Sequence, residues 1–139
     1  MGYFYHMFSS PFIINGRFLV DPELNQITDM QLQTAFSIQA RPMKLLCLLA
    51  YNQRKIVSRQ ALPKEAGYNY NNADMELVQD ISYLRKLLCD DRQILLQNIA
   101  ENGYLLNGAI TDPHGLLQQD TGTQSSLHTI QKYSWLEYF

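Results

Sequence analysis

The residues with the clearest chemical potential lie in a predicted amphipathic helix near the middle of the chain. Arg85 and Lys86 form a basic pair, and cations of this kind neutralise phosphates and release counterions. Gln79, Ser82 and Tyr83 lie off the apolar stripe of the same helix, and a glutamine can pair bidentately with adenine. This pattern predicts contacts with the backbone and base edges of double-stranded DNA. A solvated helix face with a cationic C-terminus is the alternative interpretation.

Three further candidates lie outside this helix. Arg59 opens another predicted helix, and a helix N-terminus is a natural phosphate anchor. Asn98 can offer its amide to a phosphate, whereas Asn102 precedes Gly103 and is first of all a turn residue. The candidate DNA-binding residues are therefore Arg59, Gln79, Ser82, Tyr83, Arg85, Lys86, Asn98 and Asn102.

A helix followed at once by a hairpin must position these side chains. The helix is predicted over residues 73–88, and Asp90 with Asp91 ends it. Strands are predicted over 94–99 and 104–106, joined by a tight turn set by Asn102-Gly103. This succession is typical of a winged helix, in which the helix lies in a DNA groove and the hairpin touches the neighbouring backbone. The apolar face of the helix is predicted to contain Leu77, Val78, Ile81, Leu84, Leu87 and Leu88.

Two more helices are predicted upstream. The first covers residues 41–52, with Pro42 in its first turn and a wide leucine face. The second covers residues 59–66, with Ser58 accepting a hydrogen bond from its first turn and Gly67 ending it. Pro63 is expected to shorten or distort this second helix, because proline removes a backbone hydrogen bond from a helix interior.

The N-terminal part of the chain reads as a small antiparallel sheet. Four strands are predicted over residues 12–14, 17–20, 25–28 and 32–38. Asn15-Gly16 favours a primed hairpin turn between the first two strands, and Asp29-Met30 marks a later turn. The predicted fold class is therefore α+β: a winged helix-turn-helix with an N-terminal antiparallel sheet, three helices and a C-terminal β-hairpin wing.

The predicted organisation is one domain with two flanking segments. Residues 1–11 form an aromatic N-terminal segment, residues 12–110 the winged-helix domain, and residues 111–139 a linker and C-terminal tail. The near-helical spacing of apolar residues after position 126 is compatible with a short helix that docks on the core or on a second copy. The sequence contains no run of 18 apolar residues and no pattern of a signal peptide, so a reduced cytoplasmic protein without a membrane segment is expected.

Enzymatic chemistry has little support in the sequence. His6, His114 and His128 lie far apart, and neither a nucleophile triad nor a Gly-rich phosphate loop stands out. Cys47 and Cys89 lack metal-ligand spacing, and Cys47 fits a small core residue. We therefore expect no catalytic residues, no metal site and no cofactor.

Four segments in order carry a family resemblance. They are Leu45-Leu46-Cys47-Leu48-Leu49 followed by Ile56-Val57-Ser58-Arg59, then Ile81 to Leu88, Gln97-Asn98-Ile99, and Gly103-Tyr104. With this spacing, residues 12–110 resemble the DNA-binding domain of OmpR/PhoB-type response regulators, in particular the ToxR/CadC-like branch of transcription activators. The resemblance implies a bacterial regulator that binds promoter DNA, commonly as a dimer on tandem half-sites, and that contacts RNA polymerase through the loop between the second and third helices.

The charge balance keeps a second function open. The net charge of the whole chain is −2, and residues 11–110 contain ten Lys or Arg and ten Asp or Glu. Non-specific DNA affinity depends mostly on positive charge, and Asp80 beside phosphates is expected to repel them. The alternative is a winged-helix module that binds another regulator or a second copy through an acidic helix face at Glu76 and Asp80 and through its aromatic termini.

Overall fold

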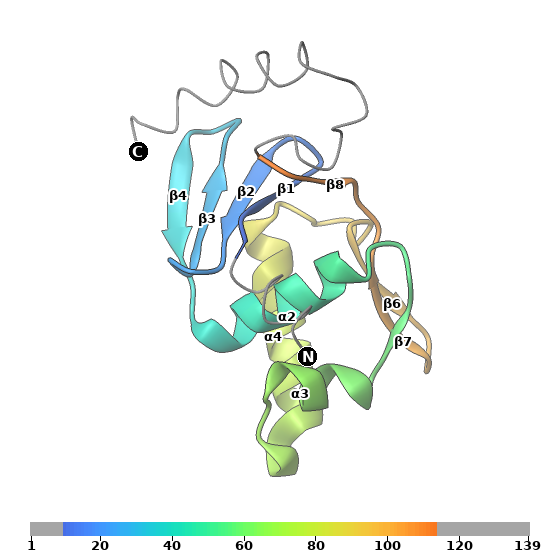
Figure 1. Ribbon diagram of the computed structural model, residues 1–139. Helices are drawn as coiled ribbons and strands as arrows, with labels where there is room; N and C mark the ends of the chain where they lie inside the picture. The colour runs from blue at the N-terminus through green and yellow to red at the C-terminus, as the bar shows by residue number, and fades with distance from the viewer. Residues whose placement is uncertain (1–9, 114–139) are drawn as a thin grey trace.

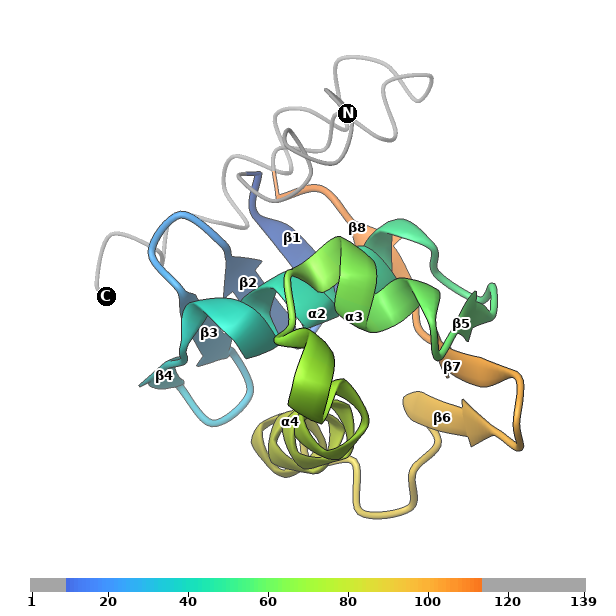
Figure 2. The same ribbon diagram turned by 90° about the horizontal axis from the view of Figure 1, so that it is seen from below.

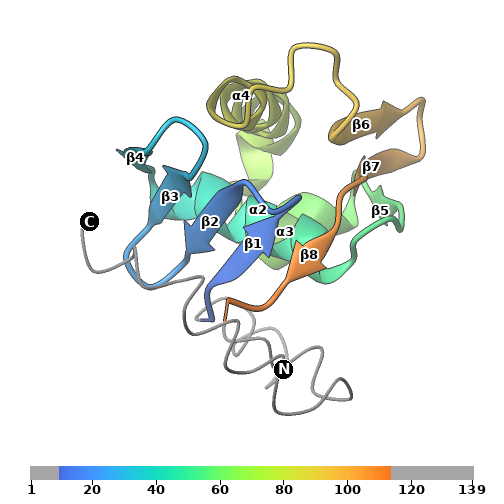
Figure 3. The same ribbon diagram turned by 90° about the horizontal axis from the view of Figure 1, so that it is seen from above.

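The computed structural model describes residues 10–113. Its N-terminal part is the predicted antiparallel sheet, in which each of the four strands pairs with the next (Figures 1 and 3). A fifth short strand, which the sequence did not predict, joins the first, so the strand order is β4-β3-β2-β1-β8. The strands are β1 (Phe12–Ile14), β2 (Phe18–Asp21), β3 (Gln26–Asp29), β4 (Thr34–Ser37) and β8 (Ile110–Thr111).

The turn between β1 and β2 has the predicted primed geometry. Asn15 and Gly16 have φ angles of 53° and 67°, and the Arg17 N–H donates to the Ile14 carbonyl at 3.0 Å. The same turn holds the strand β8: the Asn15 N–H donates to the Ala109 carbonyl, and the Ala109 N–H donates to Asn15 Oδ1, both at 2.8 Å. The segment that follows the last hairpin is therefore attached to the N-terminal sheet as its edge strand.

The three predicted helices are present, with boundaries shifted by no more than two residues. They are α2 (Ala40–Tyr51), α3 (Ala61–Ala66) and α4 (Ala73–Leu87), and a short 3-10 helix η1 (Tyr70–Asn72) precedes α4. The sheet lies across α2, which also packs against α3 and α4 (Figures 1 and 3). A helix contacted on several sides must be apolar around much of its circumference. The leucine face of α2 is accordingly fully buried, as expected: Leu45, Leu46, Leu48 and Leu49.

The helix that contains Pro63 is short, as expected, with six residues. The helix α3 begins at Ala61, so Pro63 lies in its first turn, where the backbone N–H has no partner within the helix. Ser58 Oγ accepts a hydrogen bond from the Ala61 N–H at 3.0 Å, as predicted, although it lies just before the helix rather than at its cap position. Gly67 ends α3 in the left-handed conformation, with a φ of 79°.

The C-terminal hairpin is part of a three-stranded sheet. Its strands β6 (Leu96–Ile99) and β7 (Gly103–Leu106), here called the wing, pair with each other, and β5 (Val57–Ser58) pairs with β7 on its other side. The turn predicted at Asn102-Gly103 lies slightly earlier in the chain, because the residue with positive φ in the turn is Ala100 and Gly103 is the first residue of β7. Gly103 is required there for another reason: a Cβ atom would lie 2.0 Å from the Val57 carbonyl oxygen of β5.

Candidate nucleic-acid interface

The helix α4 and the wing lie side by side and are fastened together by two side chains (Figures 2 and 3). The Arg85 guanidinium donates from Nε and Nη2 to the Leu96 carbonyl of β6, at 3.0 and 2.7 Å. The Asp90 carboxylate, which is buried, accepts the backbone N–H groups of Ile94, Leu95 and Leu96 at 2.8–2.9 Å. A helix and a hairpin joined in this way present one surface of fixed shape to a partner.

Arg59 fastens the other end of the wing. Its Nη2 donates to Asn98 Oδ1 at 2.7 Å and to the Ala100 carbonyl at 3.1 Å, and its guanidinium lies 5.0 Å from the ring centroid of Tyr104. The oxygens that hold Arg59 and Arg85 are all neutral. Both residues therefore keep the wing in place and still contribute their positive charges to the field around it.

The outward side of α4 presents a line of exposed side chains opposite the buried stripe of Leu77, Ile81 and Leu84. At about 100° per residue, positions separated by three or four residues fall on the same face of a helix. Val78 and Tyr83 flank this line and are 50% and 40% exposed. The line itself, which we call the outer face of α4, comprises Met75, Gln79, Ser82 and Lys86.

Two of the three acids of α4, Glu76 and Asp80, are turned away from the outer face. Asp80 is only 6% exposed and accepts from Arg41 Nε at 2.7 Å and from Arg41 Nη2 at 3.1 Å, while Glu76 lies 3.3 Å from Arg41 Nη1. The hydroxyl of Tyr68 also donates to Asp80. Both the expected repulsion between Asp80 and phosphates and the expected acidic face at Glu76 and Asp80 are therefore wrong, because a cation from α2 binds both carboxylates inside the fold.

The protonation states of this cluster follow from its surroundings. Burial, and then the hydrogen bond to Asp80, raise the pKa of Tyr68 well above its usual value, so Tyr68 is a neutral hydroxyl donor. The hydrogen bond to Asp80 likewise raises the pKa of Arg41, which is charged at every relevant pH. The cluster of Arg41, Tyr68, Glu76 and Asp80 thus attaches α4 to α2 and to the segment between α3 and α4.

We expect Arg41→Ala to lower the free energy of unfolding by about 2 kcal/mol. Removing one partner of a largely buried ion pair leaves the other charge without compensation, and the partial exposure of Arg41 moderates the loss. Urea denaturation of the variant and the wild type measures it. Lys44→Ala, an exposed position one turn along the same helix, is the control and should change stability by less than about 0.5 kcal/mol. Equal effects of the two substitutions would show that the cluster does not hold α4.

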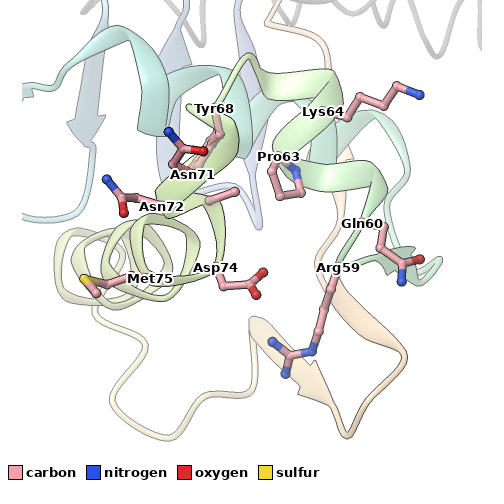
Figure 4. Close-up of a pocket in the computed structure, with 10 residues that line it drawn as sticks. Arg59, Gln60, Pro63, Lys64, Tyr68, Asn71, Asn72, Asp74 and Met75 are labelled. Carbon is pink, nitrogen blue, oxygen red and sulfur yellow. The ribbon is translucent and has the colours of Figure 1, made fainter.

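A groove open to solvent separates α3 from the start of α4 (Figure 4). Arg59 and Gln60 lie on one side of it, and Asp74 and Met75 rise from the first turn of α4 on the other. Asp74 points across this groove and not along the outer face of α4 (Figure 4). The groove is thus bordered by a side chain that holds the wing and by the first residue of the outer face.

The structure brings most of the predicted site residues to one region and leaves one at its margin. Gln79, Ser82 and Lys86 are exposed on the outer face, and Asn98 and Asn102 are exposed on the wing. Arg59 and Arg85 are partly buried because they hold the wing, so a phosphate contact by either remains a prediction. Tyr83 lies at the margin: it lines a shallow depression with residues of the link between β4 and α2, on the side of Asp80.

Sequence reasoning missed two exposed apolar residues of this surface. Val78 was predicted to widen the buried stripe, but it is half exposed, and Met75 is 64% exposed. The available signal was spacing, since Val78 follows Met75 by three residues and is out of phase with Leu77, Ile81 and Leu84. Hydrophobicity alone suggested a core position for a valine that the helix geometry directs outward.

Other chemistries find no support in the part of the chain that the structure describes. Within residues 10–113, no three His, Cys, Asp or Glu side chains are grouped so that they could hold a metal ion. Burial raises the pKa of Cys47 to about 12, so this thiol is a neutral core group and not a nucleophile. Among the same residues, no helix is both long and apolar enough to span a bilayer. The predicted N-terminal aromatic segment up to residue 9 and the predicted tail from residue 114 lie outside the described residues.

Comparisons with known proteins agree with this geometry. The family model described as "Transcriptional regulatory protein, C terminal" matches residues 33–106, more than half of the chain. Among solved structures, the DNA-binding domain of E. coli CadC is similar with a TM-score of 0.62 and 24% sequence identity, over 73% of this chain and 94% of that one. At this identity the likeness shows a common fold. No match was found among curated proteins.

Proposed function

Because the chain belongs to the family of C-terminal, OmpR/PhoB-type DNA-binding domains of transcriptional regulatory proteins, we propose that it regulates transcription by binding promoter DNA through α4 and the wing. The winged-helix fold expected from the sequence is confirmed, and so is the family. In the proposed complex α4 enters the major groove with its outer face towards the bases, and the wing lies along the neighbouring backbone.

One observation supports this proposal above the others: α4 exposes polar and cationic side chains beside a fixed wing, and two of its acids are bound by Arg41. The number of acidic residues in the domain overstates the negative charge that DNA would meet. Asp29 is bound to Arg17 at 2.9 Å, and Asp90 is buried among backbone N–H groups. The positive charges of Arg59, Arg85 and Lys86 are all close to the wing or on α4, where a phosphate backbone would pass.

The roles proposed for individual residues follow from their exposure. Gln79 and Ser82 face the bases, and Lys86 binds a phosphate beside the groove. Asn98 and Asn102 contact the backbone from the wing, Tyr83 flanks the groove, and Arg59 and Arg85 add charge while they keep the wing in position. RNA polymerase is the proposed protein partner of the loop between α3 and α4, a homodimer is the proposed assembly, and a bacterial cytoplasm is the proposed place of action.

Fluorescence anisotropy with pooled genomic fragments tests the proposal. We expect binding that weakens steeply with salt, and we expect Lys86→Ala to weaken it several-fold and to reduce the slope of log K against log salt by about 0.9, the value for one phosphate contact. Lys86 is exposed, so the substitution leaves the fold unchanged, whereas Arg85→Ala would also loosen the wing. Lys44→Ala, on α2, is the matched control and should keep the wild-type slope.

One result would contradict this proposal. A folded chain that binds no DNA even at low salt would overturn the proposal and favour the second candidate, a winged-helix module that binds another regulator. The specific observation in favour of that candidate is the exposure of Met75, Val78 and Tyr83, since apolar and aromatic side chains are common at the centres of protein interfaces.

A further inference from the structure

We propose that α4 reads the 5-methyl groups of thymine through Met75 and Val78, so that the preferred DNA site has T·A base pairs opposite the first half of the helix. This inference rests on the proposed function, because it takes double-stranded DNA as the ligand. It adds a base preference and two specificity-determining residues that the polar residues of the outer face do not provide.

The first support is the exposure of two apolar side chains one helical turn apart. Met75 is 64% and Val78 is 50% exposed, although the buried stripe of α4 is already complete without them. A β-branched residue at an exposed helix position is a poorer helix former than alanine. Because at least half of each side chain is exposed, neither is needed for the core, and both are available to a ligand with apolar groups.

The second support is the match between this pair and the major groove. Thymine alone among the four bases places a methyl group in that groove, and small apolar side chains contact it. Side chains three residues apart on a helix have Cβ atoms about 5–6 Å apart, and successive bases on one strand rise by about 3.4 Å. Met75 and Val78 can thus reach methyl groups on neighbouring base pairs.

The third support comes from the hydrogen-bonding side chains beside the pair. The most frequent specific contact in protein–DNA complexes is Arg or Lys to guanine, and the guanidinium of Arg85 on α4 is directed to the Leu96 carbonyl instead. Gln79, which lies one residue after Val78, has an amide that matches adenine. Gln79 would recognise adenine, and Met75 and Val78 would recognise thymine methyl groups. Both kinds of contact therefore favour A·T base pairs.

Charge complementarity decides between DNA and an apolar protein surface as the occupant. Arg59, Asp74 and Met75 all line the groove between α3 and the start of α4 (Figure 4). Arg85 and Lys86 lie farther along the helix than Val78. The oxygens that hold Arg59 and Arg85 are neutral, so their charges attract a polyanion. A surface with two apolar contacts, three nearby cations and one exposed acid, Asp74, suits the floor and walls of a DNA groove.

The test removes the methyl groups without changing the base sequence. A pool of randomised duplexes is enriched for binding to the full chain and is then copied with either dTTP or dUTP, since uracil lacks the 5-methyl group. We expect the wild-type chain to bind the uracil pool about fifteenfold more weakly, because each of the two buried methyl groups is worth about fourfold in affinity. Sequencing of the enriched thymine pool should show clustered T·A pairs.

Variants separate this proposal from a general effect of uracil on the duplex. The double variant Met75→Ala with Val78→Ala should bind both pools equally and keep its salt dependence, and alanine at exposed helix positions preserves the helix. Leu32→Ala, at an exposed apolar position between β3 and β4, should keep the wild-type preference for the thymine pool. Equal binding of both pools by the wild-type chain, with steep salt dependence, would overturn the methyl reading and leave the proposed function standing. Absence of salt-dependent binding to either pool would overturn both.

Discussion

Replacing Gly103 with alanine is expected to lower the free energy of unfolding by about 4 kcal/mol, the largest loss for any single substitution proposed for this chain. The new Cβ atom would lie 2.0 Å from the Val57 carbonyl oxygen and 2.9 Å from the Ser58 Cα atom, both backbone atoms of β5. A φ of +153° is also disfavoured for an L residue. Overpacking and backbone strain each cost about 1–3 kcal/mol, and neither can relax without moving a strand.

Urea denaturation followed by far-UV circular dichroism measures this loss. Gly16→Ala is the control, because Gly16 also has a positive φ, of +67°, but a Cβ atom there would meet nothing within 4 Å. It should cost only about 1–2 kcal/mol, the usual penalty of a left-handed conformation for a residue with a side chain. If the two variants unfold at the same urea concentration, the close approach of β5 to β7 does not hold in solution.

Replacing Asp90 with alanine is expected to have the second-largest effect, a loss of about 3 kcal/mol. The carboxylate accepts three consecutive backbone N–H groups at 2.8–2.9 Å, and those of Leu95 and Leu96 are buried. Each buried donor left without a partner costs about 1–3 kcal/mol, and water cannot replace the carboxylate without opening the core. The substitution would therefore release the connection between α4 and the wing.

The neighbouring acid provides a matched control for the Asp90 variant. Asp91 is exposed and has the same side chain, so Asp91→Ala should change stability by less than about 0.5 kcal/mol. Asp90→Asn should fall between the two, since its amide oxygen still accepts from Ile94 and Leu95 while its NH2 group faces the Leu96 donor. Amide hydrogen exchange at Leu95 and Leu96 reports the loss directly, and unchanged protection in Asp90→Ala would contradict the role assigned to the carboxylate.

The helices and the first hairpin could be predicted because their signals are local. Leu77, Ile81 and Leu84 repeat with the period of a helix, and Asn15-Gly16 has the backbone freedom that a primed turn requires. The pairing of Val57 with Tyr104 could not be predicted in the same way, because the two residues are far apart in the sequence and β5 is too short to show alternation. The same limit explains the missed strand β8.

The exposure of the candidate residues could be predicted better than their contacts within the fold. Gln79, Ser82 and Lys86 are exposed as expected, since the buried stripe fixes the opposite face of the helix. Asp80 looked like a surface acid because its partner Arg41 comes from another helix, and Arg85 looked like a free cation because the Leu96 carbonyl belongs to the wing. Long-range polar partners decide such roles, and a single sequence does not state them.

The short ladder between β1 and β8 joins the two ends of the described domain. Ile13 pairs with Thr111 and Ile14 with Ile110, and hydrogen bonds between Asn15 and Ala109 extend this contact between the first and last strands. The family match ends at Leu106, before β8. A fragment that stops there would lack the strand that pairs with β1, and Ile14 would lose its neighbour at the edge of the sheet. A fragment that is to fold stably must therefore extend through Thr111.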